Sequence, residues 1–395
     1  MAHFRHRLAQ EALKKALKHS PIVGLFGHRQ AGKTTLIERL ASAYVTLDLR
    51  ETLQILEQSP MAFLEGNMGS PLAIDESQLS PSLFPALKEF VRRMPRPGQF
   101  LLTGSVRYSS RQQIRESLTG RIMNFELTPM GLHELYEKPL GSHWGKIIKT
   151  ANPLALLEHT PIFTDGDIKK YIIKGGLPGF FAIRDSEVLN RKRESLIETL
   201  LERDLRLLIQ TTLDFPVLRN FLSILASKQC EALDFSHLAR QSGISLPAVK
   251  RLLSAFQSMF LIRILPTIGE KHPILLFEDP GEGSYLAPNL RSEVNIIRAL
   301  FAHLRPLLEF GCKERAEFFQ YRTRGQAFVP LAFKANDLNV GFICSSLDGA
   351  TAKHIASAQS FLKHFPKSLV FIIHQGKQIQ QLQKNLVILP IRYVF

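Results

Sequence analysis

The feature that most constrains the fold is a glycine-rich loop ending in lysine and threonine. Its residues are Gly27, His28, Arg29, Gln30, Ala31, Gly32, Lys33, Thr34 and Thr35, in the spacing G-x-x-x-x-G-K-T. The apolar run Ile22–Phe26 before it predicts a buried strand, and Lys33–Ala43 after it predicts a helix. This order brings backbone N–H groups and a helix N-terminus around phosphate oxygens. The segment therefore predicts a phosphate-binding loop in an α/β domain.

Two side chains of the loop have expected roles in binding ATP with Mg²⁺. Lys33 is expected to reach the β- and γ-phosphates, and the Thr34 hydroxyl is expected to ligate the metal. The alternative is a glycine-rich turn that carries a lysine by chance. That alternative leaves the flanking strand and helix unexplained, so the phosphate-binding interpretation is preferred.

Two carboxylates end a second apolar run, Pro71–Ile74, in the positions Asp75 and Glu76. Beside the phosphate loop, Asp75 would hold the Mg²⁺ shell through water, and Glu76 would orient and deprotonate the attacking water. Alone, the pattern is more typical of a strand that leads into a solvated turn. Its position downstream of the loop favours the catalytic interpretation.

A third strand is predicted over Gln99–Ser105, and it ends in small polar residues. The Ser105 hydroxyl could touch the γ-phosphate or the attacking water. A plain strand followed by a turn fits the spacing equally well.

Composition places the chain among ordinary globular proteins. Its 395 residues suffice for about two or three domains, with 22% charged and 45% hydrophobic residues. No apolar stretch approaches the ~20 residues of a membrane span, and Met1–Ser20 is basic without a signal-peptide core. Cys230, Cys312 and Cys344 are far apart and show no metal-binding spacing. These features predict a cytoplasmic protein with no membrane partner.

The net charge of +15 is unevenly distributed. Lys88–Arg121 holds eight Lys or Arg against two acids, and Gly349–Phe395 holds six and none, so each segment carries +6. Such patches suit nucleic acid or another polyanion as a partner. A merely solvated basic surface explains them equally well.

Several motifs together resemble those of prokaryotic AAA-type ATPases with an appended domain of unknown function, the DUF4143 family. Besides the loop, they are Tyr44-Val45-Thr46-Leu47-Asp48, Ile74-Asp75-Glu76-Ser77-Gln78, Leu102-Thr103-Gly104-Ser105, Ser117-Leu118-Thr119-Gly120-Arg121, Gly175-Gly176-Leu177-Pro178 and Glu202-Arg203-Asp204-Leu205. Their order agrees over nearly the whole chain. His28 stands where the family has proline, outside the phosphate-contacting positions.

The resemblance implies two further catalytic residues. Ser105 would occupy the sensor position, and Arg121 would lie where an arginine can stabilise charge on the γ-phosphate, in cis or on a neighbouring chain. An oligomer is therefore a candidate assembly. The alternative for Arg121 is a surface ion pair, the usual fate of an arginine after a turn.

The middle of the chain predicts helices over Thr164–Leu208 and a winged helix-turn-helix over Asp234–Pro266. In a DNA reader, the exposed residues Lys250 and Arg251 would face the groove or the phosphates. The segment Thr211–Glu270 carries a net charge of only +2, with six basic and four acidic residues. An unidentified protein therefore remains the other candidate partner.

The last domain resembles a restriction-endonuclease-like fold, in which carboxylates and a lysine on adjacent strands hold Mg²⁺. Here the first motif position reads Phe328-Val329-Pro330, and the second reads approximately Ile343-Cys344-Ser345. Lys334 and Asp337 lie nearby in the wrong order. Apolar and small residues do not ligate a hard cation, so no nuclease activity is expected.

The predicted fold class is α/β, with four regions. Residues 1–160 form an AAA-type P-loop domain with a parallel sheet, and 161–210 form a helical linker. Residues 211–275 form the winged helix, and 276–395 form the small, degenerate nuclease-like domain. The leading interpretation is a Mg²⁺-dependent ATPase whose nucleotide state controls the C-terminal domains. The alternative is a nucleic-acid-binding or interaction switch that binds ATP with little turnover.

Overall fold

The computed structural model describes residues 5–67, 69–107 and 118–395. The chain forms two compact units, each described here by itself. Unit 1 consists of Met1–Thr128 with Ser258–Phe260, and unit 2 consists of Pro129–Gln257 with Leu261–Phe395.

Unit 1 ends earlier than the boundary expected at residue 160. The segment after Thr128 includes helix α8 (His143–Thr150), whose Trp144 is fully buried in the main core of unit 2. The Trp144 ring lies 6.0 Å from that of Phe333 and 5.9 Å from that of Phe342, centroid to centroid. Burying an indole among aromatic rings is strongly favourable, so this segment belongs with the unit that supplies its core.

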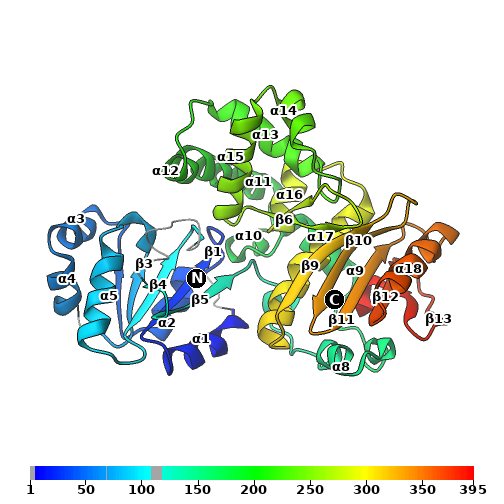
Figure 1. Cartoon of the computed structure of the whole chain (residues 1–395), viewed down its shortest axis with the longest axis horizontal. Coiled ribbons are helices and arrows are strands. Elements are labelled where there is room, and N and C mark those ends of the chain that lie inside the picture. Colours follow the sequence, from blue (N-terminus) through cyan, green and yellow to red (C-terminus); the bar gives the residue numbers. More distant parts are fainter. Residues whose placement is uncertain (1–4, 68, 108–117) are drawn as a thin grey trace. The chain divides into compact units, whose positions relative to one another are not determined.

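Unit 1 alternates strands and helices. Its elements are α1 (Ala9–Leu17), β1 (Ile22–Gly27), α2 (Lys33–Leu40), β2 (Ala43–Thr46), α3 (Arg50–Gln58), α4 (Pro60–Gly66), β3 (Leu72–Asp75), η1 (Ser77–Leu79), α5 (Leu83–Arg93), β4 (Phe100–Gly104) and β5 (Ile122–Leu127). The five strands form one parallel sheet in the order β2-β3-β4-β1-β5 (Figure 1). This is the predicted parallel α/β sheet, with β1 between two neighbours.

Burial explains the elements of unit 1. Every residue of β1 is buried, as expected for an inner strand of a parallel sheet covered on both faces. Helix α5 buries Leu83, Leu87 and Phe90 on one side and exposes charged residues on the other. Helix α2 ends at Leu40, short of the predicted Ala43, because Ala43 is already the first residue of β2.

Unit 2 contains helical and mixed segments. Its elements are α7 (Leu132–Leu135), α8, η3 (Pro153–Leu156), α9 (Asp165–Lys174), α10 (Pro178–Phe181), α11 (Ser186–Thr199), the π-helix η4 (Leu200–Asp204), α12 (Leu205–Leu208), α13 (Phe215–Ser227), α14 (Phe235–Ser242), α15 (Leu246–Ser258), β6 (Ile262–Leu265), β7 (Thr267–Ile268), β8 (Ile274–Phe277), α16 (Pro280–Leu286), α17 (Ser292–Pro306), the π-helix η5 (Leu307–Gly311), β9 (Ala316–Arg322), β10 (Phe328–Ala335), β11 (Leu338–Cys344), α18 (Ala352–His364), β12 (Ser368–His374), β13 (Gln380–Gln383), β14 (Leu386–Pro390) and η6 (Ile391–Tyr393).

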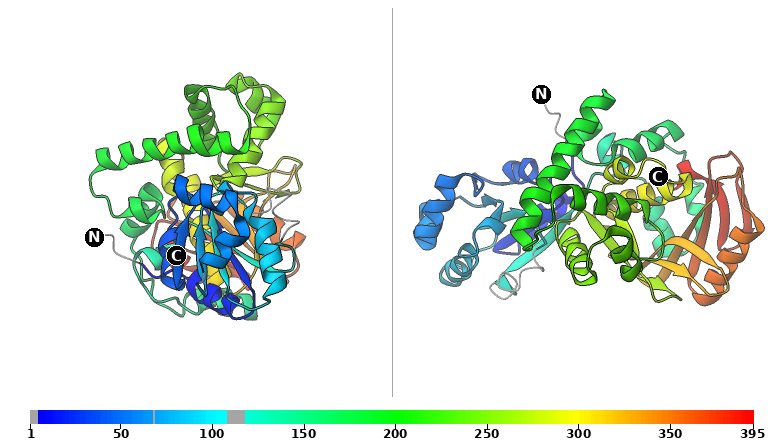
Figure 2. Two further views of the ribbon diagram at one scale, coloured as in Figure 1. Left: turned by 90° about the vertical axis from the view of Figure 1, so that its left-hand side faces the viewer. Right: turned by 90° about the horizontal axis from the view of Figure 1, so that it is seen from above.

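The large sheet of unit 2 has seven strands in the order β13-β14-β12-β11-β10-β9-β7. Strands β9, β10 and β11 form an antiparallel meander, and β12 and β14 add in parallel. One face carries Phe333 and Phe342 in the core with α17, and the other packs Val329 and Ile343 with α18. Figure 2 shows this sheet in yellow, orange and red.

Helices and paired strands occur where the winged helix-turn-helix was predicted. Gly243 turns the chain between α14 and α15 with a φ of 69°, a conformation that glycine adopts without cost. Strands β6 and β8 pair antiparallel, with Ile262 opposite Phe277. On α15, Val249 and Phe256 are buried, whereas Lys250 and Arg251 are exposed.

Candidate functional site

The phosphate loop joins β1 to α2 at the carboxyl edge of the parallel sheet. Gln30 and Gly32 both have positive φ, at 63° and 94°. A side chain on Gly27 would place its Cβ 2.2 Å from the Leu127 carbonyl oxygen, so that position requires glycine. The buried Lys33 ammonium donates to the carbonyls of Gly27 at 3.1 Å and His28 at 3.0 Å. The loop therefore curls around its own lysine.

Asp75 is the centre of a hydrogen-bond network at the end of β3. One carboxylate oxygen, Oδ2, accepts the hydroxyls of Thr34 at 2.6 Å and Tyr44 at 3.1 Å. The other, Oδ1, accepts the Thr103 hydroxyl and the Glu76 backbone N–H. Burial, reinforced by the charge of Asp75, raises the pKa of Tyr44, so the phenol stays a donor. The structure thus joins the predicted metal pair, Thr34 and Asp75, directly.

Glu76 follows Asp75 in a left-handed conformation with a φ of 54°. A non-glycine residue held there stores roughly 1–3 kcal/mol of strain, which is typical of functional sites. Its carboxylate accepts a hydrogen bond from the Gln78 amide, and the same amide nitrogen lies 3.4 Å from the Ser105 hydroxyl. Glu76 and Ser105 therefore come together beside the loop, although their catalytic roles stay predictions.

Three residues of this network were not assigned a role from the sequence. Tyr44 and Thr103 both donate to Asp75, and Gln78 bridges Glu76 to Ser105. Each lies within a motif that the resemblance picks out. Their partners lie up to 31 residues away in the chain, so no local pattern identified those partners.

Arg121 lies at the opposite edge of the sheet from the phosphate loop. It directly precedes β5, whose first residue, Ile122, pairs with Ile22 at the start of β1. The loop follows Gly27, at the far end of the same strand. A strand of this length spans about 17 Å, so the placement does not fit a role for Arg121 on this chain's own γ-phosphate. A role on a neighbouring chain stays a prediction.

The residues present fit a nucleotide-bound magnesium ion. Mg²⁺ prefers oxygen ligands and is usually held by one or two protein groups together with phosphates and water. Thr34 and Asp75 offer two oxygens 2.6 Å apart at the end of the phosphate loop. Among residues 5–67, 69–107 and 118–395, no group of three or more His, Cys, Asp or Glu side chains could hold a metal by itself.

The nuclease-motif positions of unit 2 hold packing residues. Ile343 faces α18, whereas Phe342 and Cys344 face α17, so residues two apart on β11 share a face. Phe342 and Cys344 therefore share the face with Trp144, and Ile343, the first residue of the second motif position, lies on the opposite face. Both are buried and apolar in character.

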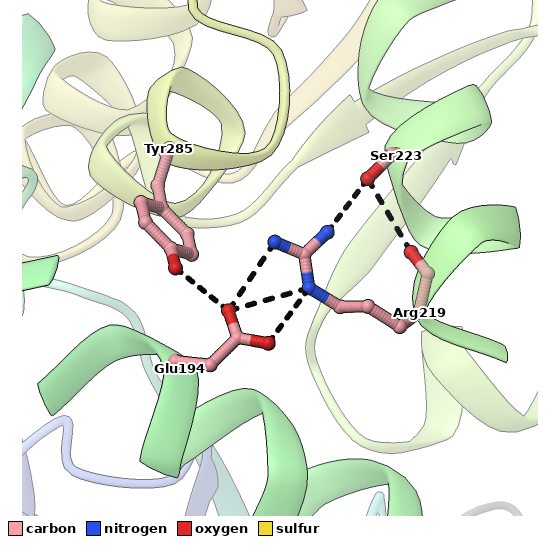
Figure 3. Close-up of polar contacts among 4 residues, drawn as sticks. All are labelled: Glu194, Arg219, Ser223 and Tyr285. Carbon is pink, nitrogen blue, oxygen red and sulfur yellow. Dashed lines mark hydrogen bonds and ion pairs between the residues drawn. The ribbon is translucent and has the colours of Figure 1, made fainter. Parts of the chain in front are cut away.

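A second polar cluster fixes three helices of unit 2 (Figure 3). Glu194 of α11 accepts from Arg219 of α13 at 3.1 Å and from the Tyr285 hydroxyl of α16 at 2.7 Å. Arg219 also donates to Ser223 at 2.7 Å. Burial raises the pKa of Glu194, but the hydrogen bonds from Arg219 and Tyr285 outweigh it and lower the pKa overall. The cluster positions α13, the helix that precedes α14 and α15.

Two regions of the chain match two different protein families. Residues 19–136 match a family described as AAA domain, and residues 165–274 match a domain of unknown function, DUF8612. The N-terminal region is therefore similar to an AAA domain, in keeping with its phosphate loop and parallel sheet. The second match differs from the DUF4143 domain that the motifs resemble, so that finer assignment is not established.

Two curated relatives match most of the chain. An uncharacterized protein of Mycobacterium bovis and another of Mycobacterium tuberculosis are each 29% identical over 262 residues. The match covers 66% of this chain and 53% of each relative. The chain thus spans about half the length of these relatives.

Two solved structures show a distant likeness to this chain. A Walker-type ATPase of Pyrococcus abyssi is 14% identical, with a TM-score of 0.43, over 70% of this chain and 94% of that one. A signal transduction ATPase with a tetratricopeptide repeat sensor from Pyrococcus horikoshii is 13% identical, with a TM-score of 0.29, over 79% and 48%. Likenesses of this degree add nothing on function.

Within the part of the chain that the structure describes, no helix is both long and apolar enough to cross a membrane.

Proposed function

We propose that this protein is a Mg²⁺-dependent ATP hydrolase whose nucleotide state controls its second unit. The observation that carries the proposal is the hydrogen bond of 2.6 Å between Thr34 and Asp75, with Glu76 next in the chain. It puts a hydroxyl, a carboxylate and a candidate base at one sheet edge beside the phosphate loop. The relationship to AAA-type ATPases with an appended DUF4143 domain, which the motifs of the chain resemble, is part of the same proposal.

Each residue has one task in the proposed reaction. Bound Mg²⁺ would offset the charge that develops on the β- and γ-phosphate oxygens. Lys33 would leave its loop carbonyls and pair with those phosphates. Glu76 would take a proton from the attacking water, while Gln78 holds the carboxylate and Ser105 within reach of each other. Thr34 and Asp75 would orient the metal shell.

The test separates binding from turnover. Glu76→Gln keeps the shape but cannot accept the proton, so ATP binding by calorimetry should persist while phosphate release falls on the order of 10²-fold or more. The exposed Glu65→Gln is the matched control and should leave both unchanged. Unchanged turnover in Glu76→Gln would remove the assigned base.

The second candidate function is nucleic-acid binding by unit 2, with ATP as a switch of low turnover. A cavity of about 540 Å³ adjoins the turn before α15. Arg206 and Arg251 line it, and no carboxylate does. Glu202 holds Arg206 at 3.1 Å, whereas Arg251 is exposed. A cationic hollow on the second helix of a helix-turn-helix favours backbone phosphates.

Two sets of variants distinguish sequence-specific DNA contacts by α15 from non-specific binding by the basic C-terminal segment. Lys250→Gln with Arg251→Gln should relax a sequence preference if α15 reads DNA. Lys353→Gln, Lys363→Gln and Lys367→Gln, on exposed residues, should weaken binding uniformly and flatten its salt dependence if the C-terminal charge dominates. Absence of binding at low salt would leave a protein as the partner of both segments.

We also propose that the sheet of unit 2 is a degenerate nuclease-like domain without cleavage activity. At the two motif positions, Phe328, Pro330 and Ile343 supply no carboxylate. Plasmid and single-stranded DNA should stay intact with Mg²⁺ or Mn²⁺. Cleavage that disappears in Asp337→Asn would overturn this assignment. A cytoplasmic location fits the three free cysteines.

A further inference from the structure

Arg7 is a buried cation that contacts the phosphate loop from the N-terminal segment. Its side chain is only 2% exposed, just ahead of α1. Nη1 donates to the Ala31 carbonyl at 2.6 Å, and Nη2 donates to the Thr128 carbonyl at 2.7 Å. One guanidinium thus joins two points that lie 24 and 121 residues away in the chain.

This position calls for arginine in particular. Burying a charge costs several kcal/mol unless hydrogen bonds compensate it. The planar guanidinium presents two parallel donors and can serve two carbonyls at once, whereas a lysine ammonium acts as a point charge. Bonds from an ionised donor are also roughly twice as strong as neutral ones. Arg7 therefore holds both carbonyls in a defined relation.

Holding the Ala31 carbonyl sets the direction of the next N–H. A trans peptide is planar, so the carbonyl of Ala31 and the N–H of Gly32 point in opposite directions. Pulling the carbonyl toward Arg7 turns the Gly32 N–H away from Arg7. Gly32 is the second glycine of the phosphate loop, so this N–H is one of the donors available to a phosphate.

The second contact lies where the chain leaves unit 1. Thr128 directly follows β5 and is the last residue of the unit before Pro129 begins unit 2. The same side chain therefore ties the loop to the exit segment. If nucleotide binding moves the Ala31 carbonyl, Arg7 is the group that can pass the change to Thr128, and such a coupling is reciprocal.

We propose that Arg7 is a positioning residue that aims the Gly32 N–H at a nucleotide phosphate and couples the loop to the exit segment at Thr128. This inference rests on the proposed nucleotide site. It concerns a residue outside every motif that the sequence singled out.

Arg7→Lys and Arg7→Gln test the positioning role. Lysine keeps the charge and glutamine keeps one neutral donor, so affinity should fall in the order Arg, Lys, Gln. We expect Arg7→Lys to raise the Kd for ADP and the KM for ATP about 10-fold, with kcat changed less than about twofold. Lys14→Gln, on the exposed side of α1, is the control and should match the wild type.

The outcomes are distinct. Lower thermal stability with unchanged Kd and KM would make Arg7 merely structural and overturn the inference. If the wild type binds no nucleotide, the proposed function fails and the inference falls with it. For the coupling, ADP should slow hydrogen exchange at Leu127 and Thr128 in the wild type and much less in Arg7→Lys. Equal protection in both proteins would overturn the link to the exit segment.

Discussion

The sheet of unit 1 holds polar side chains where its central strands end, whereas the sheet of unit 2 holds apolar or small residues at its two nuclease-motif positions. In unit 1, Asp75 and Thr103 bond to each other, and Ser105 follows β4. In unit 2, Phe342 and Cys344 pack into the core with Trp144, and Ile343 packs on the other face of the sheet. Layered α/β architecture is common to both. The residues at the strand ends therefore decide whether a sheet edge offers chemistry or only packing.

The difference has a physical origin in what the side chains contact. Asp75 is buried and receives four donors, so its charge is compensated and can serve a cation. Around Trp144 the neighbours are aromatic rings, which offer no such compensation. A carboxylate introduced there would lose its hydration without gaining partners. A buried carboxylate is thus compensated at the position of Asp75 and would be destabilising beside Trp144.

The largest expected effect is the loss of ATP binding in Lys33→Ala. The change removes the cation that faces the β- and γ-phosphates, and affinity should fall on the order of 10²-fold or more. Isothermal titration with ATP and ADP is the measurement, and Lys14→Ala on exposed α1 is the control. Retained affinity would show that the edge of unit 1 is as inert as that of unit 2.

Phe342→Ala should affect stability and spare nucleotide binding. Removing a fully buried ring leaves a cavity and should lower the free energy of unfolding of unit 2 by about 3–5 kcal/mol. Trp144 is the one tryptophan of the chain and lies beside Phe342, so its fluorescence reports this unit. Urea unfolding followed by that signal measures the loss.

The control for this prediction is Leu347→Ala, a residue of unit 2 that is 59% exposed. It should change stability by no more than about 0.5 kcal/mol. A large change in ADP affinity in Phe342→Ala, with an intact Trp144 signal, would contradict a purely structural role for this position.

The smallest expected effect is a pH dependence confined to unit 2. His143 stacks on His159 with ring centroids 4.0 Å apart, and His133 stacks on His303 at 5.4 Å. Burial lowers the pKa of all four, that of His143 to about 3. Neighbouring histidines lower the pKa of His133, His143 and His303 further, although Glu134 opposes this at His133. The folded state therefore holds this cluster neutral.

The sign follows from proton counting. Between about pH 6.5, where unfolded histidine titrates, and about pH 3, His143 binds more protons in the unfolded chain than in the folded one. The free energy of unfolding is thus undiminished by this group above the upper end of the window and falls as the pH drops through it. At pH 5, the lowered pKa of His143 alone reduces the free energy of unfolding by about 2 kcal/mol relative to its value above the window.

Unfolding followed by Trp144 fluorescence from pH 7 to pH 4 measures this slope. His143→Gln should flatten it, whereas His237→Gln, at an exposed histidine of the same unit, should not. An unchanged slope in His143→Gln would show that other groups of unit 2 govern its acid sensitivity.

Sequence alone predicted those parts of the site that depend on neighbouring residues. The phosphate loop is contiguous, and the strand before it and the helix after it were identified from local patterns. Asp75 and Glu76 were placed at a strand end for the same reason. The parallel sheet is confirmed, whereas the catalytic roles stay predictions.

Other assignments required the three-dimensional arrangement. The boundary at Thr128 depends on the core into which Trp144 packs. The position of Arg121 depends on the register between β1 and β5, because a parallel strand places its first residue at the far edge. Local sequence carries no information on either relation.

What the sequence by itself determined is therefore the phosphate loop, since G-x-x-x-x-G-K-T specifies backbone conformation and charge within eight residues. Only the tertiary structure decided which distant groups hold that loop in place. Arg7, Tyr44 and Thr103 reach Ala31 or Asp75 across 24 to 31 residues. Such contacts depend on how strands and loops meet in space, and no spacing along the chain encodes them.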